Sequence, residues 1–225
     1  MASTFQRARS EEQRAVRRQT ILDTAAAMLE EMPVAELSLN ELSRRVGLAK
    51  SNVLRYFDSR EAVLLELLDA LTREWLEHLS REVPAAVSAR AGFERRAERL
   101  AGTIARSLAA RPVLCDLVSA QAAVLEHNVS AAAIVSFKRR GVAHAAAFGD
   151  LVRHALPELS EDQTWRLVVG VLLLTSSLWP HATPSQALVD AYAQIPELSS
   201  MRLDFVDALE DSLVTIAMGL HARRM

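Results

Sequence analysis

Apolar residues recur at helical spacing along most of the chain. In the first predicted helix, residues 16–32, the i, i+3, i+4 positions are apolar and Pro33 ends the pattern. The apolar positions are Ile21, Leu22, Ala25, Leu29 and Met32. The same spacing predicts later helices over residues 60–80, 92–110, 113–128, 130–155, 161–179, 185–194 and 201–223. No segment has the alternation of a strand, so we expect an all-α fold.

Two short helices are predicted between these longer ones. Ser38 and Glu41 have the spacing of a capping box, so a helix is expected from there to about Val46, and Gly47 is placed to end it in a left-handed conformation. A third helix is expected over residues 50–57. Two helices joined by a short turn containing glycine have the spacing of a helix-turn-helix.

The third predicted helix has two different faces. Val53, Leu54 and Phe57 form an apolar stripe, and the opposite side carries only hydrogen-bonding groups with no acid. Those groups are a guanidinium, an amide, a phenol and a small hydroxyl, the types that contact base edges and phosphates. An ordinary solvated face is the alternative, since short surface helices are commonly polar on one side.

Composition and charge restrict the class of protein. The chain has only 7 Gly and 7 Pro in 225 residues, which favours long helices over a sandwich or barrel. Its net charge of −2 divides unevenly, because residues 1–60 hold ten basic and eight acidic side chains (+2) and the rest hold 16 and 20 (−4). A nucleic-acid surface is therefore expected near the N-terminus. One cysteine and no apolar leader are typical of a cytoplasmic protein, and the uncharged segment 167–189 is interrupted by Pro180 too early to span a membrane.

Residues 38–61, reading SLNELSRRVGLAKSNVLRYFDSRE, resemble the DNA-binding signature of the TetR family of bacterial transcriptional repressors. The resemblance extends over about residues 16–70. It implies a homodimer whose third helices enter successive major grooves of a DNA operator, with larger C-terminal domains that dimerise and bind a small-molecule effector. The organisation expected from it is a flexible basic arm at 1–15, a helix-turn-helix domain at 16–59, and an effector-binding and dimerisation domain at 60–225. For the basic arm, contact with DNA and a disordered tail both remain open.

The resemblance also assigns DNA contacts by position. The residues expected to touch DNA are Ser38, Asn40, Arg45, Lys50, Ser51, Asn52, Arg55, Tyr56 and Arg60. Of the neighbours Arg44 and Arg45, Arg45 is the expected phosphate partner. Family members often carry tyrosine where this chain has Leu54, and we assign Leu54 to packing. A two-fold dimer predicts an inverted-repeat operator.

Two C-terminal helices have the pattern of a dimer interface. Helix 161–179 is apolar almost all round, which also fits the central core helix of a monomeric domain. The last helix repeats apolar residues at spacings of three and four, as in a packed helical seam. The expected interface residues are Val168, Val171, Leu172, Val206, Leu209, Leu213, Ile216 and Leu220.

The effector pocket is the least determined feature. Aromatic and polar residues on the predicted helices between 60 and 155 suit a hydrophobic, hydrogen-bonding ligand, although each alone is more commonly core or surface. The candidates are Trp75, Phe93, Cys115, Gln121, His127, Phe137, His144 and Phe148. Cys115 fits a small core residue better than a redox sensor, because the sequence puts no cation beside it.

An enzyme is not expected from this sequence. The six histidines form no metal-ligand motif, and there is neither a glycine-rich phosphate loop nor a nucleophile elbow, so we expect no metal and no cofactor. The sequence therefore favours a DNA-binding transcriptional regulator, most simply a repressor released by a small molecule. The alternative is a helical small-molecule-binding or interaction protein whose helix-turn-helix no longer binds DNA.

Overall fold

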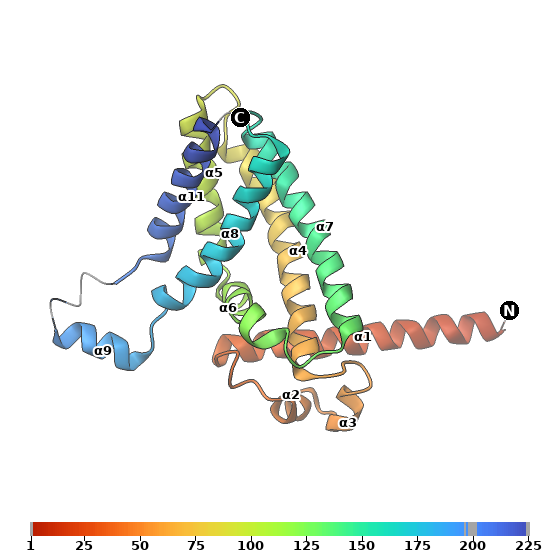
Figure 1. Cartoon of the computed structure of the whole chain (residues 1–225). Coiled ribbons are helices and arrows are strands. Elements are labelled where there is room, and N and C mark those ends of the chain that lie inside the picture. Colours follow the sequence, from red (N-terminus) through yellow and green to blue (C-terminus); the bar gives the residue numbers. More distant parts are fainter. Residues whose placement is uncertain (1, 196, 198–201, 224–225) are drawn as a thin grey trace. The chain divides into compact units, whose positions relative to one another are not determined.

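The computed structural model describes residues 2–195, 197 and 202–223, and these form helices with no strand among them (Figure 1). Contacts divide the chain into two compact units. Unit 1 comprises residues 1–70 and 120–137, and unit 2 comprises residues 71–119 and 138–225. The division falls ten residues beyond the predicted boundary at residue 60, and it assigns a later segment, 120–137, to the unit that holds the helix-turn-helix.

Unit 1 is built on three N-terminal helices and the start of a fourth. These are α1 (Ala2–Glu31), α2 (Leu39–Val46), α3 (Lys50–Val53) and the first part of α4 (Arg60–Ala86). Its core is the predicted apolar stripe of α1 packed with residues from the other helices. The fully buried members include Ile21, Ala25, Met28, Leu42, Val53, Val63 and Leu64.

Helix α1 begins much earlier than the pattern predicts. The helix starts at Ala2 and not at Val16, so the segment expected to be a flexible arm is helical. Residues 11–17 are all exposed. The segment before Val16 is mostly polar and has no apolar period, and for that reason hydrophobic spacing could not locate this end of α1.

The turn between α2 and α3 has the predicted geometry. Gly47 is left-handed at φ 72°, and its N–H donates to the carbonyl of Arg44 at 3.2 Å, while Leu48 N donates to Ser43 O at 3.0 Å. This pair of bonds is the Schellman arrangement, which satisfies the last carbonyls of a helix. The left-handed residue without a Cβ therefore sets the direction in which the chain enters α3.

Helix α3 is shorter than expected. It ends at Val53, after which Arg55 N bonds Asn52 O and Tyr56 N bonds Val53 O, both three residues apart. This tighter turn rotates the side chains that follow. Phe57 and Val53 are buried, but Leu54 is 41% exposed, so its assignment to packing is wrong.

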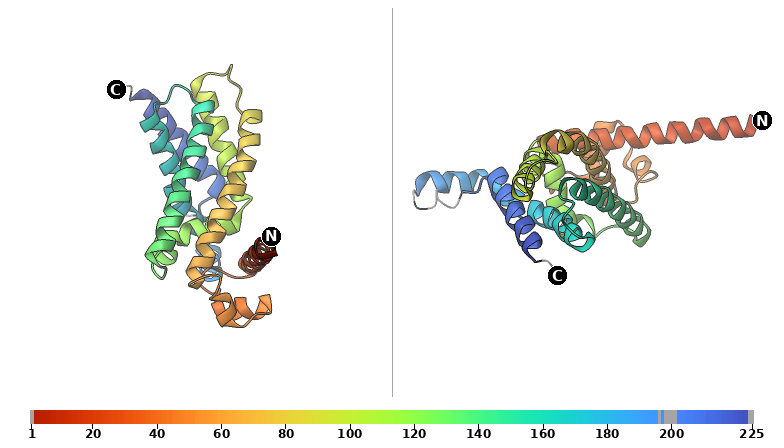
Figure 2. Two further views of the ribbon diagram at one scale, coloured as in Figure 1. Left: turned by 90° about the vertical axis from the view of Figure 1, so that its right-hand side faces the viewer. Right: turned by 90° about the horizontal axis from the view of Figure 1, so that it is seen from above.

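Unit 2 contains the rest of α4 together with α5 (Phe93–Ala109), most of α6 (Pro112–Ala120) and the second part of α7 (Ala131–Ala155). It also contains α8 (Glu161–Ala182), α9 (Gln186–Gln194) and α11 (Phe205–Ala222). Helix α11, the last and darkest blue ribbon, packs against α5 and α8 (Figure 2). The predicted last helix began at residue 201, which lies outside the described residues. In the structure, α11 follows the N-cap Asp204.

Between α6 and α7 the predicted helix 113–128 is interrupted. Residues Gln121–Leu125 form a π-helical turn, η1, in which Glu126 N bonds Gln121 O five residues back. No residue type in this segment signals that wider turn.

Within the described residues, no single helix is both long and apolar enough to cross a membrane. Two helix pairs meet that length and hydropathy only when joined across bends of 92° and 64°. They are Phe93–Ala109 with Pro112–Leu125, and Glu161–Ala182 with Gln186–Gln194.

Candidate nucleic-acid interface

The face predicted on the third helix is present in unit 1. Lys50, Ser51, Asn52 and Arg55 are exposed, while Val53 points into the core. Tyr56 is half-buried. The exposed set presents two cations, an amide and a hydroxyl on one short segment. Such groups can donate to phosphates and to base edges in a major groove.

At the start of α2, Ser38 and Asn40 are also exposed. The Ser38 hydroxyl accepts a hydrogen bond from Glu41 N at 3.2 Å, so this side chain caps the helix. An N-cap satisfies one of the free N–H groups at a helix start and fixes where that start lies. Ser38 therefore positions α2, and its predicted contact with DNA stays a prediction.

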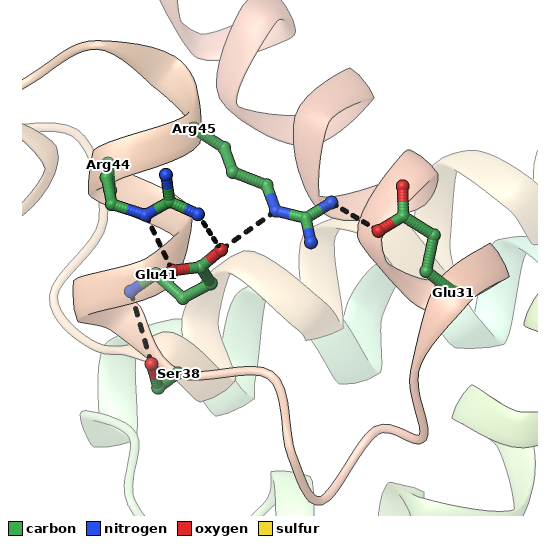
Figure 3. Close-up of polar contacts among 5 residues, drawn as sticks. All are labelled: Glu31, Ser38, Glu41, Arg44 and Arg45. Atoms are coloured by element: carbon green, nitrogen blue, oxygen red, sulfur yellow. Dashed lines mark hydrogen bonds and ion pairs between the residues drawn. The ribbon is translucent and has the colours of Figure 1, made fainter.

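Two arginines of α2 converge on one carboxylate. Arg44 donates to both oxygens of Glu41 at 2.9 and 2.6 Å, and Arg45 Nε donates to Glu41 Oε1 at 3.0 Å (Figure 3). Arg45 also reaches Glu31 of α1 at 2.7 Å. The hydrogen bonds from Arg44 and Arg45 lower the pKa of Glu41 from 4.5 to about 2. The carboxylate is thus ionised at neutral pH and binds both guanidinium groups.

This cluster bears on which arginine is available for phosphate. Arg45 links α2 to α1 and leaves 28% of its side chain exposed, whereas 73% of the Arg44 side chain is exposed. Each arginine makes two charge-assisted bonds, Arg44 both to Glu41 and Arg45 one each to Glu41 and Glu31. The choice of Arg45 as the phosphate partner therefore stays a prediction, with Arg44 the more exposed of the two. The pairing of Arg45 with Glu31 is a contact across fourteen residues, which spacing along one helix cannot reveal.

Arg60, expected to bind phosphate, is also held inside unit 1. It donates to the backbone carbonyl of Val34 and to Glu61 Oε1 at 3.3 Å, and 19% of its side chain is exposed. It joins the N-terminus of α4 to the turn between α1 and α2. Arg60 therefore supports the architecture of the domain, and its expected contact with a phosphate stays a prediction.

Arg18 supports the candidate site from α1, a role that the sequence analysis missed. Its guanidinium lies 4.3 Å from the centroid of the Phe57 ring, and it donates to the carbonyl of Tyr56 and to the carboxylate of Glu66. We call residues 50–57 the recognition segment. The Arg18 side chain thus connects α1, the end of the recognition segment and α4. The available signal was its position, because Arg18 lies three and four residues before Ile21 and Leu22, within the apolar stripe.

The effector candidates are divided between the two units. Gln121, His127 and Phe137 belong to unit 1, where Gln121 donates to Glu126 Oε1 at 2.8 Å and His127 is exposed. The other candidates belong to unit 2. Trp75 is buried there, donates to Ser107 Oγ at 3.0 Å and packs edge-on against Phe148 at 5.2 Å. This aromatic pair is the part of the predicted set that the structure brings together.

The remaining unit 2 candidates lie apart from that pair or inside the core. Phe93 stacks on His221 with centroids 3.9 Å apart, and it precedes Ser107 by fourteen residues, or about 21 Å of helix. His144 is half-buried. Cys115 is fully buried, and burial, reinforced by Asp116, raises the pKa of its thiol to about 12. The thiol is therefore protonated at neutral pH, in keeping with a core residue.

The predicted dimer residues are mostly part of unit 2's own core. Five of the eight are buried within the single chain: Val168, Val171, Leu209, Leu213 and Leu220. Val206 and Ile216 are partly exposed, and the Ile216 side chain lies against Gly170 of α8. These side chains already have partners, since the apolar seam of α11 is used to pack on α5 and α8. Buried groups cannot reach a partner without repacking, so within the single chain only Leu172, Val206 and Ile216 of the predicted set leave surface for a partner; the interface itself stays a prediction.

A different apolar surface is left uncovered on α8. Trp165, Leu172 and Leu173 are exposed, and their spacings of seven and eight residues place them on one side of the helix. We call these three residues the α8 outer strip. Only Leu172 belongs to the predicted interface.

No group of three metal-ligating side chains that could hold an ion occurs among the described residues. What unit 1 presents is a capped helix-turn-helix with exposed cationic and amide side chains. The fold and this surface define the class as a helix-turn-helix DNA-binding regulator.

Comparison with known proteins identifies the family. The model described as "Tetracyclin repressor-like, C-terminal domain" matches residues 69–224, and that described as "Bacterial regulatory proteins, tetR family" matches residues 21–67. The chain therefore belongs to the TetR family of transcriptional regulators and is not an enzyme.

Individual relatives are similar over different parts of the chain. The regulator EthR of Mycobacterium tuberculosis is 41% identical over 54 residues, which is 24% of this chain and 25% of EthR, so the match spans a quarter of that relative. A TetR regulator from Rhodococcus sp. RHA1 has a TM-score of 0.59 at 15% identity and covers 93% of this chain and 97% of its own. FadR from Bacillus subtilis, solved in complex with stearoyl-CoA, has a TM-score of 0.54 at 11% identity and covers 88% and 96%. At these identities the two structures show the shared fold.

Proposed function

We propose that this protein binds an inverted-repeat DNA operator as a homodimer and that a small-molecule effector releases it. The observation that carries the proposal is the exposed, acid-free set Lys50, Ser51, Asn52 and Arg55 on a capped helix-turn-helix. A protein that does not bind DNA would not need these groups concentrated on one segment.

Affinity and sequence choice come from different side chains. Cations facing phosphates supply binding that is independent of sequence and falls with salt. Arg55 can pair with guanine and Asn52 with adenine through two hydrogen bonds each, and a pair of this kind discriminates by about 1–3 kcal/mol. Both side chains are exposed and have no hydrogen-bond partner among the described residues.

Dimerisation through the α8 outer strip gives the two-fold symmetry that an inverted repeat requires. Trp165, Leu172 and Leu173 form an apolar surface of the kind that marks an interaction site. A second copy of α8 would cover it with the same three residues, because a two-fold interface uses one patch twice.

For the effector we infer a largely apolar small molecule bound among the helices of unit 2. Trp75 and Phe148 provide aromatic surface in this region. Helix α4 contains residues of both compact units, so a ligand that favours one position of α4 can alter the spacing of the two recognition segments. A preference of a few kcal/mol between the two spacings is enough to release DNA.

The direct test is selection of bound fragments from a random DNA pool by the purified protein, followed by titration of the selected operator. We expect an inverted repeat bound by two copies of the chain. Arg55→Ala should relax the preference at one base pair per half-site by about tenfold to a hundredfold. Arg90→Ala, which removes an equal charge from an exposed site in unit 2, should leave it unchanged.

Failure to retard any fragment at low salt would refute the proposal and favour a helical ligand-binding protein without DNA activity. If DNA is bound, loss of the complex on adding a compound from a screen of apolar metabolites, acyl-CoA thioesters included, would identify the effector class. An operator complex that no compound in such a screen weakens would contradict release by an apolar effector.

A further inference from the structure

The basic side chains that the structure describes in unit 1, from Arg14 onward, fall into two groups. Arg18, Arg44, Arg45 and Arg60 each have carboxylate or carbonyl partners within the unit. Among the described residues, no hydrogen bond or ion pair engages the side chains of the second group, which are Arg14, Arg17, Lys50 and Arg55. The paired group holds the helices together, which leaves the second group as the charge available to a ligand.

Three of the unpaired side chains meet at one groove. A groove of about 1230 Å³ lies between α1 and the recognition segment. Arg14, Arg17 and Thr20 line it from α1, and Asn52, Arg55 and Tyr56 line it from the other side. Glu12 is the only acid in the lining, against three guanidinium groups. The groove therefore favours an anion.

The polar part of α1 forms a face suited to an extended anion. Arg14 and Arg17 are three residues apart and so lie on one side of the helix, about 5–6 Å apart at Cβ. Helical structure through this all-exposed segment fixes their directions in advance. A guanidinium presents a planar fork of donors that matches phosphate oxygens. Arg14 and Arg17 are exposed, so packing in a core does not explain their presence. Contact with a polyanion does explain it.

We propose that residues 12–20 of α1 are a second half of the DNA-binding surface, in which Arg14 and Arg17 bind backbone phosphates beside the major groove that receives Lys50 to Arg55. The inference rests on the proposed function and deepens it. DNA is the occupant because the groove is continuous with the base-contacting face, with Asn52 and Arg55 belonging to both. The phosphate contacts expected of Arg45 and Arg60 from the sequence are thereby transferred to α1.

The test uses the double variant Arg14→Ala/Arg17→Ala in the full-length chain. Alanine is the best helix former, so the helix should persist. Two lost phosphate contacts should lower affinity for operator and non-operator DNA by the same factor and reduce the slope of log K against log salt by about 1.8. Between about 50 and 200 mM salt, the wild-type protein should then lose about tenfold more affinity than the variant.

The matched control is Arg81→Ala/Arg90→Ala, which removes the same charge from exposed, unpaired arginines of unit 2. Equal salt slopes for the two double variants would overturn the inference, as would a change in the selected sequence without a change in slope. Unaltered helix content and thermal unfolding should accompany the expected result. If the wild-type protein itself binds no DNA, the proposed function fails, and that outcome is distinct from a variant that behaves like its control.

Discussion

Glu41 determines how much positive charge α2 can offer to DNA. The carboxylate binds Arg44 through two hydrogen bonds and Arg45 through a third. Its pKa is lowered from 4.5 to about 2, so these bonds persist throughout the neutral range. The stabilisation that they give is complete above the unfolded pKa of 4.5 and is lost as pH falls through 2.

Replacing Glu41 with glutamine should therefore increase binding to DNA of any sequence. Glu41→Gln removes a negative charge and releases Arg44, which becomes free to contact a phosphate and should steepen the salt slope by up to about 0.9. Fluorescence anisotropy on a non-operator duplex measures both effects. Glu36→Gln is the control for charge alone, because Glu36 is an exposed acid of the same unit whose side chain makes no hydrogen bond or ion pair with any described residue. Identical salt slopes for the two variants would show that Arg44 is not released.

Roles set by neighbours in sequence were predictable at this scale, and those set by tertiary contacts were not. Ser38 and Gly47 act within one turn of their own helix, so local rules locate them. Arg45 binds Glu31 and Arg60 binds the carbonyl of Val34, across fourteen and twenty-six residues. A single sequence does not distinguish an arginine that pairs inside the fold from one that is free to bind a phosphate.

In this chain, capping residues predict where helices begin and end better than the spacing of apolar residues does. Ser160 and Gln163 form a capping box at the start of α8, with Gln163 N donating to Ser160 Oγ and Ser160 N donating to Gln163 Oε1. Where no such signal exists, prediction fails. The polar first half of α1 has no apolar residue spacing to reveal it, and nothing in the composition of η1 indicates a bond to the fifth residue back.

Loss of the α8 cap should measurably destabilise the protein. Ser160→Ala leaves Gln163 N without its acceptor, and N-cap serines contribute about 1 kcal/mol. The midpoint of thermal unfolding should fall by about 2–4 °C. Ser185→Ala provides a comparison, because Ser185 occupies the N-cap position of α9 without a side-chain cap bond. Comparable midpoints for the two variants would mean that the capping box adds nothing to stability.

At the scale of the whole molecule, the two units differ in their charge and in the kind of surface that they leave exposed. The net charge of residues 1–60 is positive, and three of the four unpaired cations described in unit 1 line one groove. Unit 2 instead leaves the α8 outer strip uncovered. The apolar pattern of α11 predicts an interface with a second chain, but in the structure α11 packs on α5 and α8 of its own chain. Apolar periodicity cannot distinguish a partner helix in the same chain from one in another chain.

A charge placed in the α8 outer strip should separate the dimer without unfolding the chain. Leu173 is 60% exposed, so arginine can occupy its site in the single chain, but two such charges would face each other across a two-fold interface at a large desolvation cost. Light scattering coupled to size exclusion should show monomers for Leu173→Arg. Operator affinity should fall to that of a half-site, because the second half-site no longer benefits from a tethered partner.

Val142→Arg is the matched control, at a valine of α7 that is 66% exposed and lies outside the strip. It introduces the same charge on the same unit and should remain dimeric with full operator affinity. A Leu173→Arg protein that stays dimeric would place the interface elsewhere on unit 2. Dissociation without loss of operator affinity would break the link between dimerisation and the inverted repeat, since a monomer can contact only one half-site at a time.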